Sequence, residues 1–105
     1  MLTITLLCNL GMSTGMLIDR IKEAAEAKGI SVDVDAAPFD KANDRLDHTD
    51  ILLLGPQVRY HMPRFQKEYG GKIAVIDTID FTDYALVNGE KIFANAFAKY
   101  QSVNP

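Results

Sequence analysis

One short segment of this chain combines a thiol, a glycine and two hydroxyls: Cys8-Asn9-Leu10-Gly11-Met12-Ser13-Thr14. It follows an apolar run, Leu2–Leu7, which predicts a buried strand, and it leads into an amphipathic run, which predicts a helix. A glycine-containing turn between strand and helix directs several backbone N–H groups toward one point, where they bind a tetrahedral anion. The positive end of the helix dipole also lowers the pKa of a cysteine thiol. The segment therefore predicts a cysteine that carries, or attacks, a phosphoryl group.

The same residues have simpler interpretations. An isolated cysteine at the end of a strand is most often a small buried apolar residue. Ser13 and Thr14 can act as helix caps, with Ser13 or Thr14 at the N-cap itself. Gly11 favours the anion-binding interpretation because glycine permits backbone conformations that other residues resist. The two hydroxyls would then be additional donors to the bound anion.

Two reaction classes use a loop of this kind. Low-molecular-weight tyrosine phosphatases have a cysteine, five further residues and then an arginine that holds the phosphoryl oxygens. In this chain the position of that arginine is occupied by Thr14, and the Asp-Pro pair that supplies their general acid does not occur. Without the bidentate cation and without the acid, the loop can accept and hold a phosphoryl group but is poorly equipped for hydrolysis. A carrier is the first hypothesis. A phosphatase-like or arsenate-reductase-like enzyme, and a regulatory module with a structural cysteine, remain the alternatives.

Composition limits the other function classes. The chain has 105 residues, 48% of them apolar and 24% charged, which is ordinary for one globular domain over residues 1–105. A net charge of −3 gives no electrostatic reason to expect binding to nucleic acid or to an anionic membrane. A single cysteine excludes an internal disulfide and favours the cytoplasm. No apolar run approaches the roughly 20 residues that span a bilayer, and no signal peptide pattern is present.

Strand-like and helix-like patterns alternate along the chain, which predicts an α/β fold with a four-stranded parallel sheet and helices on both faces. The predicted strands are Leu2–Leu7, Ile30–Val34, Ile51–Leu54 and Ile73–Ile76. The predicted helices are Thr14–Lys28, Asp40–Leu46, Pro63–Tyr69 and a last helix capped by Asn88, with Ile92, Phe93, Ala96, Phe97 and Tyr100 on its buried side.

Three groups of polar or turn residues fall where predicted strands end. They are Cys8, Gly55-Pro56-Gln57 and Asp77-Thr78. Ligands of open parallel sheets bind at the carboxyl ends of the strands, where the strand order reverses. We therefore expect one site rather than three.

The segments Cys8–Thr14, Leu53-Leu54-Gly55-Pro56-Gln57 and Asp80–Lys91 resemble the IIB component of bacterial sugar phosphotransferase systems (PTS), in the lactose/cellobiose (chitobiose) branch. The resemblance follows almost the whole chain, and it implies a doubly wound α/β domain with strand order 2-1-3-4. It further implies a cytoplasmic phosphocarrier, which takes a phosphoryl group from a phosphohistidine on a IIA protein. The carrier then passes the group to sugar as the membrane permease IIC imports it.

On this resemblance, Cys8 is the phosphocysteine and therefore the catalytic nucleophile. The residues expected to cradle the phosphate are Asn9, Leu10, Gly11, Met12, Ser13, Thr14 and Gly15. Leu10, Met12, Gln57 and Tyr60 are candidates for partner docking, and the chain is expected to be a monomer. One departure from relatives is Ala85, where a glycine is frequent.

Other polar residues receive simpler roles. His48 and His61 lack the paired spacing of metal ligands, so neither a metal nor a cofactor is expected, and His61 is predicted to lie at the surface. Asp77, Asp80 and Asp83 would repel a phosphocysteine, and we expect them to face solvent or to cap turns.

Overall fold

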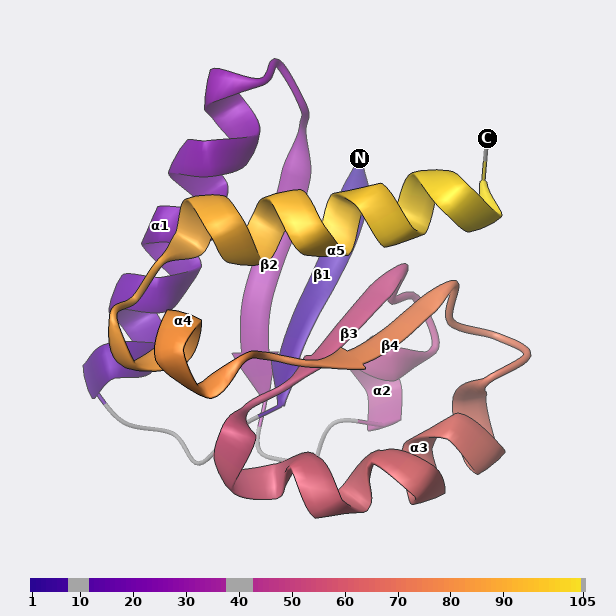
Figure 1. The fold of residues 1–105 in the computed structure, drawn as a ribbon. Coiled ribbons are helices and arrows are strands. Elements are labelled where there is room, and N and C mark those ends of the chain that lie inside the picture. The colour runs from indigo at the N-terminus through magenta and orange to yellow at the C-terminus, as the bar shows by residue number, and fades with distance from the viewer. Residues whose placement is uncertain (8–11, 38–42, 105) are drawn as a thin grey trace.

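The computed structural model describes residues 1–7, 12–37 and 43–104 (Figure 1). Its strands are β1 (Leu2–Leu7), β2 (Val32–Ala37), β3 (Ile51–Leu54) and β4 (Val75–Thr78). Its helices are α1 (Met12–Ala27), α2 (Asn43–Leu46), α3 (Met62–Tyr69), α4 (Phe81–Ala85) and α5 (Gly89–Val103), with a 3₁₀ helix, η1 (Pro56–His61), directly before α3.

The four strands form one parallel sheet in the order β2-β1-β3-β4, which confirms the predicted fold class and strand order. The central strands β1 and β3 have the bounds predicted from their apolar runs. All four residues of β3 are buried, as expected for a strand that is covered on both faces. The order reverses between β1 and β3, which places the expected ligand edge at the carboxyl ends of these two strands.

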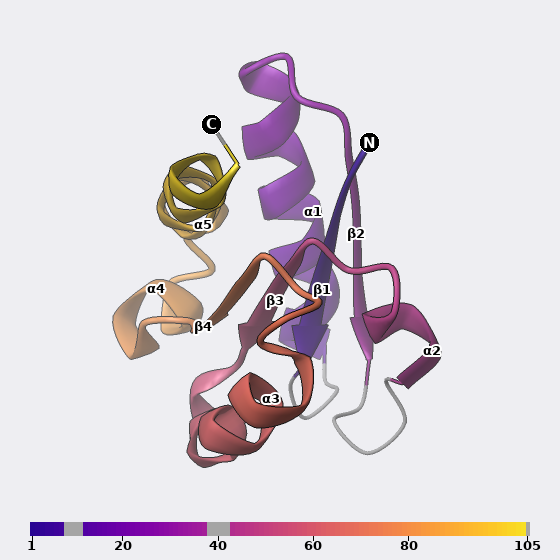
Figure 2. The same cartoon turned by 90° about the vertical axis from the view of Figure 1, so that its right-hand side faces the viewer.

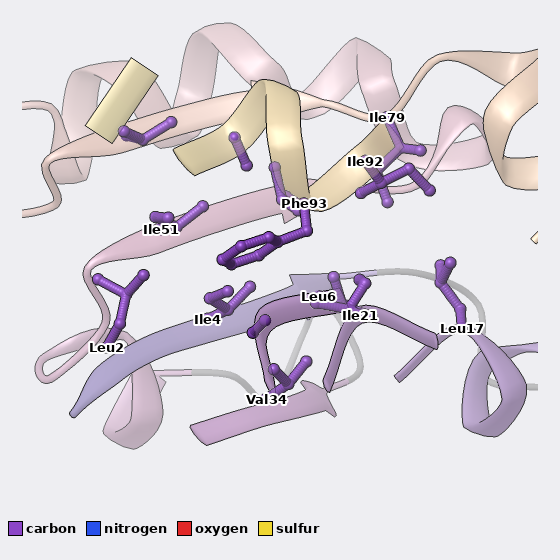
Figure 3. Packing of buried hydrophobic residues seen from close by; sticks show 14 residues of the cluster. Leu2, Ile4, Leu6, Leu17, Ile21, Val34, Ile51, Ile79, Ile92 and Phe93 are labelled. Carbon is purple, nitrogen blue, oxygen red and sulfur yellow. The ribbon is translucent and has the colours of Figure 1, made fainter. Parts of the chain in front are cut away.

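Each face of the sheet has its own apolar core. On one face, α1 and α5 pack against β1 and β3, and Figure 3 shows Phe93 pointing from α5 toward Ile4 and Leu6 of β1. On the other face, Leu7, Leu52 and Leu54 contribute to a cluster with side chains from α2, η1 and α3. Figure 2 shows α4 and α5 on one side of the strands and α2 on the other. Helices on both faces are therefore confirmed.

A buried polar network attaches α2 to the second face. The fully buried Thr5 hydroxyl lies 2.7 Å from that of Thr49 and accepts a hydrogen bond from Arg45 Nε at 2.9 Å. The Arg45 guanidinium also donates to the carbonyl oxygens of Ile4 and Asp33 and pairs with the Asp33 carboxylate at 3.5 Å. These bonds satisfy polar groups that would otherwise be costly to bury. The network fixes the short helix across β1 and β2.

The two edge strands differ from their predicted bounds. Strand β2 begins and ends later than Ile30–Val34 because pairing with β1 extends through Ala37. Strand β4 was predicted over Ile73–Ile76 but begins at Val75, since the Ile73 amide bonds back to the end of α3. Tertiary pairing thus overrides local propensity at both edges of the sheet.

Helix α4 is absent from the sequence prediction, which placed a loop there. Its N-cap is Asp80, whose carboxylate accepts hydrogen bonds from the amides of Thr82 and Asp83. The turn after α4 contains Val87 with φ of 52°, a left-handed conformation that is strained for a β-branched residue. Ala85 lies within the short helix, where a residue with a side chain is favoured over glycine.

The start of α5 is a close contact between helices. Asn88 caps α5 as predicted, because its side chain accepts a hydrogen bond from the Lys91 amide. The next residue, Gly89, is buried, and a Cβ built there would lie 2.5 Å from the carbonyl carbon of Arg20 in α1. Only glycine lets α5 approach α1 so closely.

We therefore expect Gly89→Ala to destabilise the fold. The new methyl group meets backbone atoms of Arg20, so α1 or α5 must shift, and overpacking of this kind costs about 1–3 kcal/mol. Urea denaturation followed by circular dichroism measures the change. Gly71→Ala is the control, since apart from its chain neighbours no described atom lies within 4 Å of its Cβ position, and it should stay within about 0.5 kcal/mol of the wild type. Equal stability of both variants would contradict the contact.

Candidate phosphoryl site

The last residues of the four strands lie in register beside Leu7, which directly precedes Cys8 in the sequence. Leu7, the last residue of β1, pairs with Ala37 of β2 and Leu54 of β3, and Leu54 pairs with Thr78 of β4. The Gly55 amide donates to the Leu7 carbonyl at 2.8 Å, which continues the ladder beyond β3. The carboxyl ends of the four strands therefore meet at one edge, as predicted (Figure 1).

The predicted loop itself lies between two described elements. Strand β1 ends at Leu7 and helix α1 begins at Met12. Cys8, Asn9, Leu10 and Gly11 lie outside the described residues, and so do the side chains of Met12 and Ser13. The roles predicted for these residues in phosphate binding and docking remain predictions.

The length of helix α1 and the absence of acidic residues from its first turn agree with the phosphate-binding hypothesis. The helix has 16 residues, and its first turn contains no acidic side chain to compete with an anion. The first amides of a helix have no acceptor within the helix itself, and together with the dipole they favour a negative group at this end. The helix thus begins four residues after Cys8, at the carboxyl edge of the sheet.

The predicted helix caps are wrong. Ser13 and Thr14 lie inside the first turn of α1 because the helix begins at Met12, before either of them. Thr14 is only 4% exposed, whereas the next residue, Gly15, is exposed. Serine and threonine are common both at N-caps and in first turns, so the sequence alone did not separate these positions.

The exit from β3 brings a second group of predicted residues to the same edge. Gly55 and Pro56 end the strand and start η1, as the sequence indicated. Gln57 is exposed, and Tyr60 is 71% exposed, so both docking candidates are accessible. His61 is partly buried rather than fully at the surface, and its ring lies 4.2 Å from that of Tyr60, centroid to centroid.

The three aspartates after β3 take three different positions. Asp80 has a capping role, as predicted, but it caps the helix α4, which the sequence did not predict. Asp77 lies within β4 and not after it, and its carboxylate pairs with the Lys99 ammonium. Asp83 does not face solvent: it is buried, and its carboxylate lies 3.7 Å from the Lys91 ammonium. Ion pairing with α5 explains how these two carboxylates are accommodated.

Exposed apolar side chains gather on elements that start at this edge. Met16 in α1 is 53% exposed, Tyr60 in η1 is 71%, Phe81 in α4 is 70%, and Leu86 after α4 is 71%. Among the described residues, the other large exposed apolar side chains are Met1 and Val103, near the chain ends. Sequence reasoning missed Phe81 and Leu86. The available signal was Asp80, whose capping role starts a helix at Phe81.

The described residues contain no group of three or more His, Cys, Asp or Glu side chains that could hold a metal ion. Within the same ranges, no helix is both long enough and apolar enough to span a membrane.

The parallel sheet, its strand order and the helices on both of its faces define a small doubly wound α/β protein. Comparison with known proteins identifies the family. The family described as "PTS system, Lactose/Cellobiose specific IIB subunit" matches residues 3–95. The chain belongs to this family, and it is therefore a phosphotransferase component of a sugar phosphotransferase system.

Individual relatives agree with this assignment. The chain is 32% identical to the oligo-beta-mannoside-specific EIIB component of Bacillus subtilis over 95 residues, which cover 90% of this chain and 92% of the relative. It is also 32% identical to the galactose-specific EIIB component of Lactococcus lactis, over 89% of this chain and 91% of the relative.

Solved structures have the same fold. The cellobiose-specific IIB component of Borrelia burgdorferi superposes with a TM-score of 0.76 and 33% identity, over 96% of this chain and 93% of the other. The lactose-specific IIB domain of Streptococcus pneumoniae superposes with a TM-score of 0.79, over 94% of this chain and 97% of the other. At 20% identity, the latter supports the fold alone.

Gly15 offers a test of the geometry at the start of α1. It is exposed inside the helix, and apart from its chain neighbours and the adjacent backbone of α1 no described atom lies within 4 Å of the position of an added Cβ. Alanine loses less backbone entropy in a helix than glycine, so Gly15→Ala should raise the free energy of unfolding by up to about 1 kcal/mol. Thermal and urea denaturation measure this change. A destabilised variant would contradict the described start of α1.

Proposed function

We propose that this chain is a phosphocarrier that accepts a phosphoryl group on the Cys8 sulfur from a phosphohistidine on a IIA protein. It then passes the group to a sugar during import through the membrane component IIC. The proposal places the chain in the cytoplasm, acting as a monomer, where the donor and the inner face of the permease are both accessible. Membership of the IIB family is the observation that carries it.

The geometry supports a phosphoryl group at Cys8. The residue directly follows the carboxyl end of a central strand, and the N-terminus of a 16-residue helix lies a few residues further along. Backbone amides of residues 9–15 would surround the phosphoryl oxygens, and the Ser13 and Thr14 hydroxyls would add donors. Donors that are already fixed in place stabilise transition-state charge without reorganisation.

The transfer has two balanced steps. In the first, the Cys8 thiolate attacks phosphorus, so the bond from Sγ to phosphorus forms as the phosphorus–nitrogen bond of the donor phosphohistidine breaks, and the electron pair of the broken bond stays on the imidazole. In the second, a sugar hydroxyl oxygen attacks phosphorus, the sulfur–phosphorus bond breaks, and the hydroxyl proton leaves to a base or to water. Both steps pass through loose, in-line transition states, so positioning provides most of the catalysis.

Retention of the phosphoryl group distinguishes a carrier from the alternative, a phosphatase-like or arsenate-reductase-like enzyme. Thr14 stands where the phosphatase loop has its arginine, and the chain has no Asp-Pro pair. A bidentate guanidinium stabilises the charge on the transferring phosphoryl oxygens, and a general acid assists the leaving group. A site that lacks both groups should transfer the phosphoryl group to the sugar presented by IIC much faster than to water.

Partner docking should use the exposed apolar side chains around the same edge. Tyr60 and Gln57 on η1 were candidates from the sequence, and Met16 and Phe81 extend the accessible surface on α1 and α4. Exposed aromatic residues and methionine are enriched at protein interfaces. Leu10 and Met12 remain proposed members of this surface.

Intact-mass analysis after incubation with phosphorylated IIA donor tests the proposal. We expect the chain to gain the mass of one phosphoryl group and to keep it for minutes at neutral pH. Cys8→Ser should gain nothing, because its hydroxyl is a far weaker nucleophile than a thiolate.

Gly71→Ala serves as the matched control, since it leaves the thiol and the carboxyl edge unchanged, and it should be phosphorylated like the wild type. Phosphate release from an aryl phosphate that depends on Cys8 would favour the hydrolase instead. A wild-type chain that stays unmodified in the presence of active donor would contradict the phosphocarrier.

Tyr60→Glu tests the docking surface. Replacement of this exposed ring by a carboxylate should raise the donor concentration needed for half-maximal transfer by about tenfold. This factor corresponds to the loss of one interface anchor that contributes roughly 1.4 kcal/mol. Val103→Glu is the control, because Val103 is 56% exposed at the far end of α5. Stopped transfer assays at varied donor concentration measure the effect, and melting curves show whether both variants fold. Equal KM values for the two variants would place docking elsewhere.

A further inference from the structure

Positive charge is concentrated in one segment of this acidic chain, residues 59–72, which runs from η1 through α3 into the turn after it. The segment contains four Lys or Arg residues and one Glu, so its formal charge is +3, whereas the whole chain carries −3. The rest of the chain therefore totals −6. The exposed side chains of Arg59, Tyr60, Arg64 and Lys67 together form a basic face.

The basic face lies on the solvent side of one continuous helical stretch. Arg64 and Lys67 are three residues apart in α3, so they point to the same side, whereas Phe65 marks the buried side. Tyr60 comes four residues before Arg64 and is 71% exposed. Helix η1 starts directly after β3, and α3 leads on from it (Figure 1). The basic face therefore begins at the carboxyl edge of the sheet.

The fold neutralises the cations of this face only in part. Arg64 pairs with Glu68 at 3.4 Å, and both side chains are about half exposed. The ion pairs among the described residues include neither Arg59 nor Lys67. Charges that are exposed, of one sign and without ionic partners give a surface a potential that attracts the opposite charge. The basic face therefore attracts anionic surfaces although the chain as a whole is negative.

The composition of the basic face fits an acidic surface on a protein. Tyr and Arg are enriched at protein interfaces, and a guanidinium forms two-bond pairs with carboxylates. A membrane or a nucleic acid is an extended anionic surface, and the net charge of −3 opposes its approach. Of the two proteins in the proposed function, the permease would present cytoplasmic loops rich in Lys and Arg, which repel this face. The phosphoryl donor is therefore the partner that the face fits.

We propose that the basic face docks a carboxylate-rich surface of the phosphoryl donor and accelerates its association. This inference rests on the proposed function, because it concerns the protein from which Cys8 takes its phosphoryl group. Complementary charges at the rim of an interface raise the rate of association more than they prolong the complex. A carrier must leave its donor before it meets the permease, and a fast, salt-sensitive association meets that requirement.

Timed intact-mass analysis with phosphorylated IIA donor, at donor concentrations well below KM, measures kcat/KM for transfer. Raising the ionic strength from about 0.01 M to about 0.1 M shortens the Debye length from about 30 Å to about 10 Å, and kcat/KM should fall about tenfold. Lys67→Glu should lower kcat/KM about fivefold at the lower ionic strength and weaken its dependence on salt. Lys22→Glu is the matched control, because Lys22 is an exposed lysine of α1, outside the basic face. It should transfer like the wild type.

Glu68→Gln should change kcat/KM in the opposite direction. It releases Arg64 from its ion pair and removes the one carboxylate of the segment, so transfer at low ionic strength should be about twofold faster. Glu26→Gln is its control, because it removes the same charge at an exposed position of α1. A folding defect would lower the rate in any variant, so opposite effects at positions 67 and 68 cannot come from misfolding.

The inference is overturned if wild-type transfer is independent of salt, or if Lys67→Glu and Glu68→Gln behave like their controls. In those cases phosphorylation of Cys8 still occurs, and the phosphocarrier stands without this docking face. Binding of unphosphorylated donor to the ¹⁵N-labelled Cys8→Ser chain isolates the face from the chemistry, and it should shift the amides of Tyr60, Arg64 and Lys67. Such shifts support the face even if no phosphoryl group reaches Cys8. Tighter binding to phosphatidylserine vesicles than to the donor would overturn it in favour of a membrane surface.

Discussion

The parallel pairing of β1 with both of its neighbours is the constraint on which the site depends. Leu7 is held between Ala37 and Leu54, so β1 ends at the point where the strand order reverses. A shift of one residue would turn Leu7 from one core to the other and would move every side chain of β1 to the wrong face. Because β1 contributes to both apolar clusters, that shift is strongly disfavoured, and the position of Leu7 at the end of β1 is fixed.

The helices then determine what the fixed edge can bind. Helix α1 is held by the core on one face and by the close approach of α5 at Gly89, and its N-terminus is directed at the carboxyl edge. The turn before Gly89 includes the strained residue Val87, whose side chain packs against the same core. The strained conformation of Val87 lies in the turn that brings α5 against α1, and the packing of its side chain against the core offsets the cost of this strain.

The central strands, the long helices and the ligand edge were predictable because continuous apolar runs and a 3.6-residue period are strong signals. The edge strands were not, because Asp77 and Thr78 join β4 through pairing with Leu53 and Leu54. The burial of Asp83 was missed because its partner, Lys91, lies on another helix. The caps at Ser13 and Thr14 were misplaced, since these residue types suit both an N-cap and a first turn. The chemistry of Cys8 was inferred from its neighbours in sequence, and the structure adds the position of the strand and helix on either side.

The central claim is that backbone amides at the start of α1 hold a phosphoryl group on the Cys8 sulfur. Comparing ¹H–¹⁵N spectra of the full chain before and after phosphorylation by the IIA donor tests it most directly. The account predicts large downfield amide proton shifts confined to residues 9–15, together with a ³¹P signal of a thiophosphate ester. Phosphorylation that leaves these amides unchanged, or a phosphorus signal from a group other than sulfur, would contradict it.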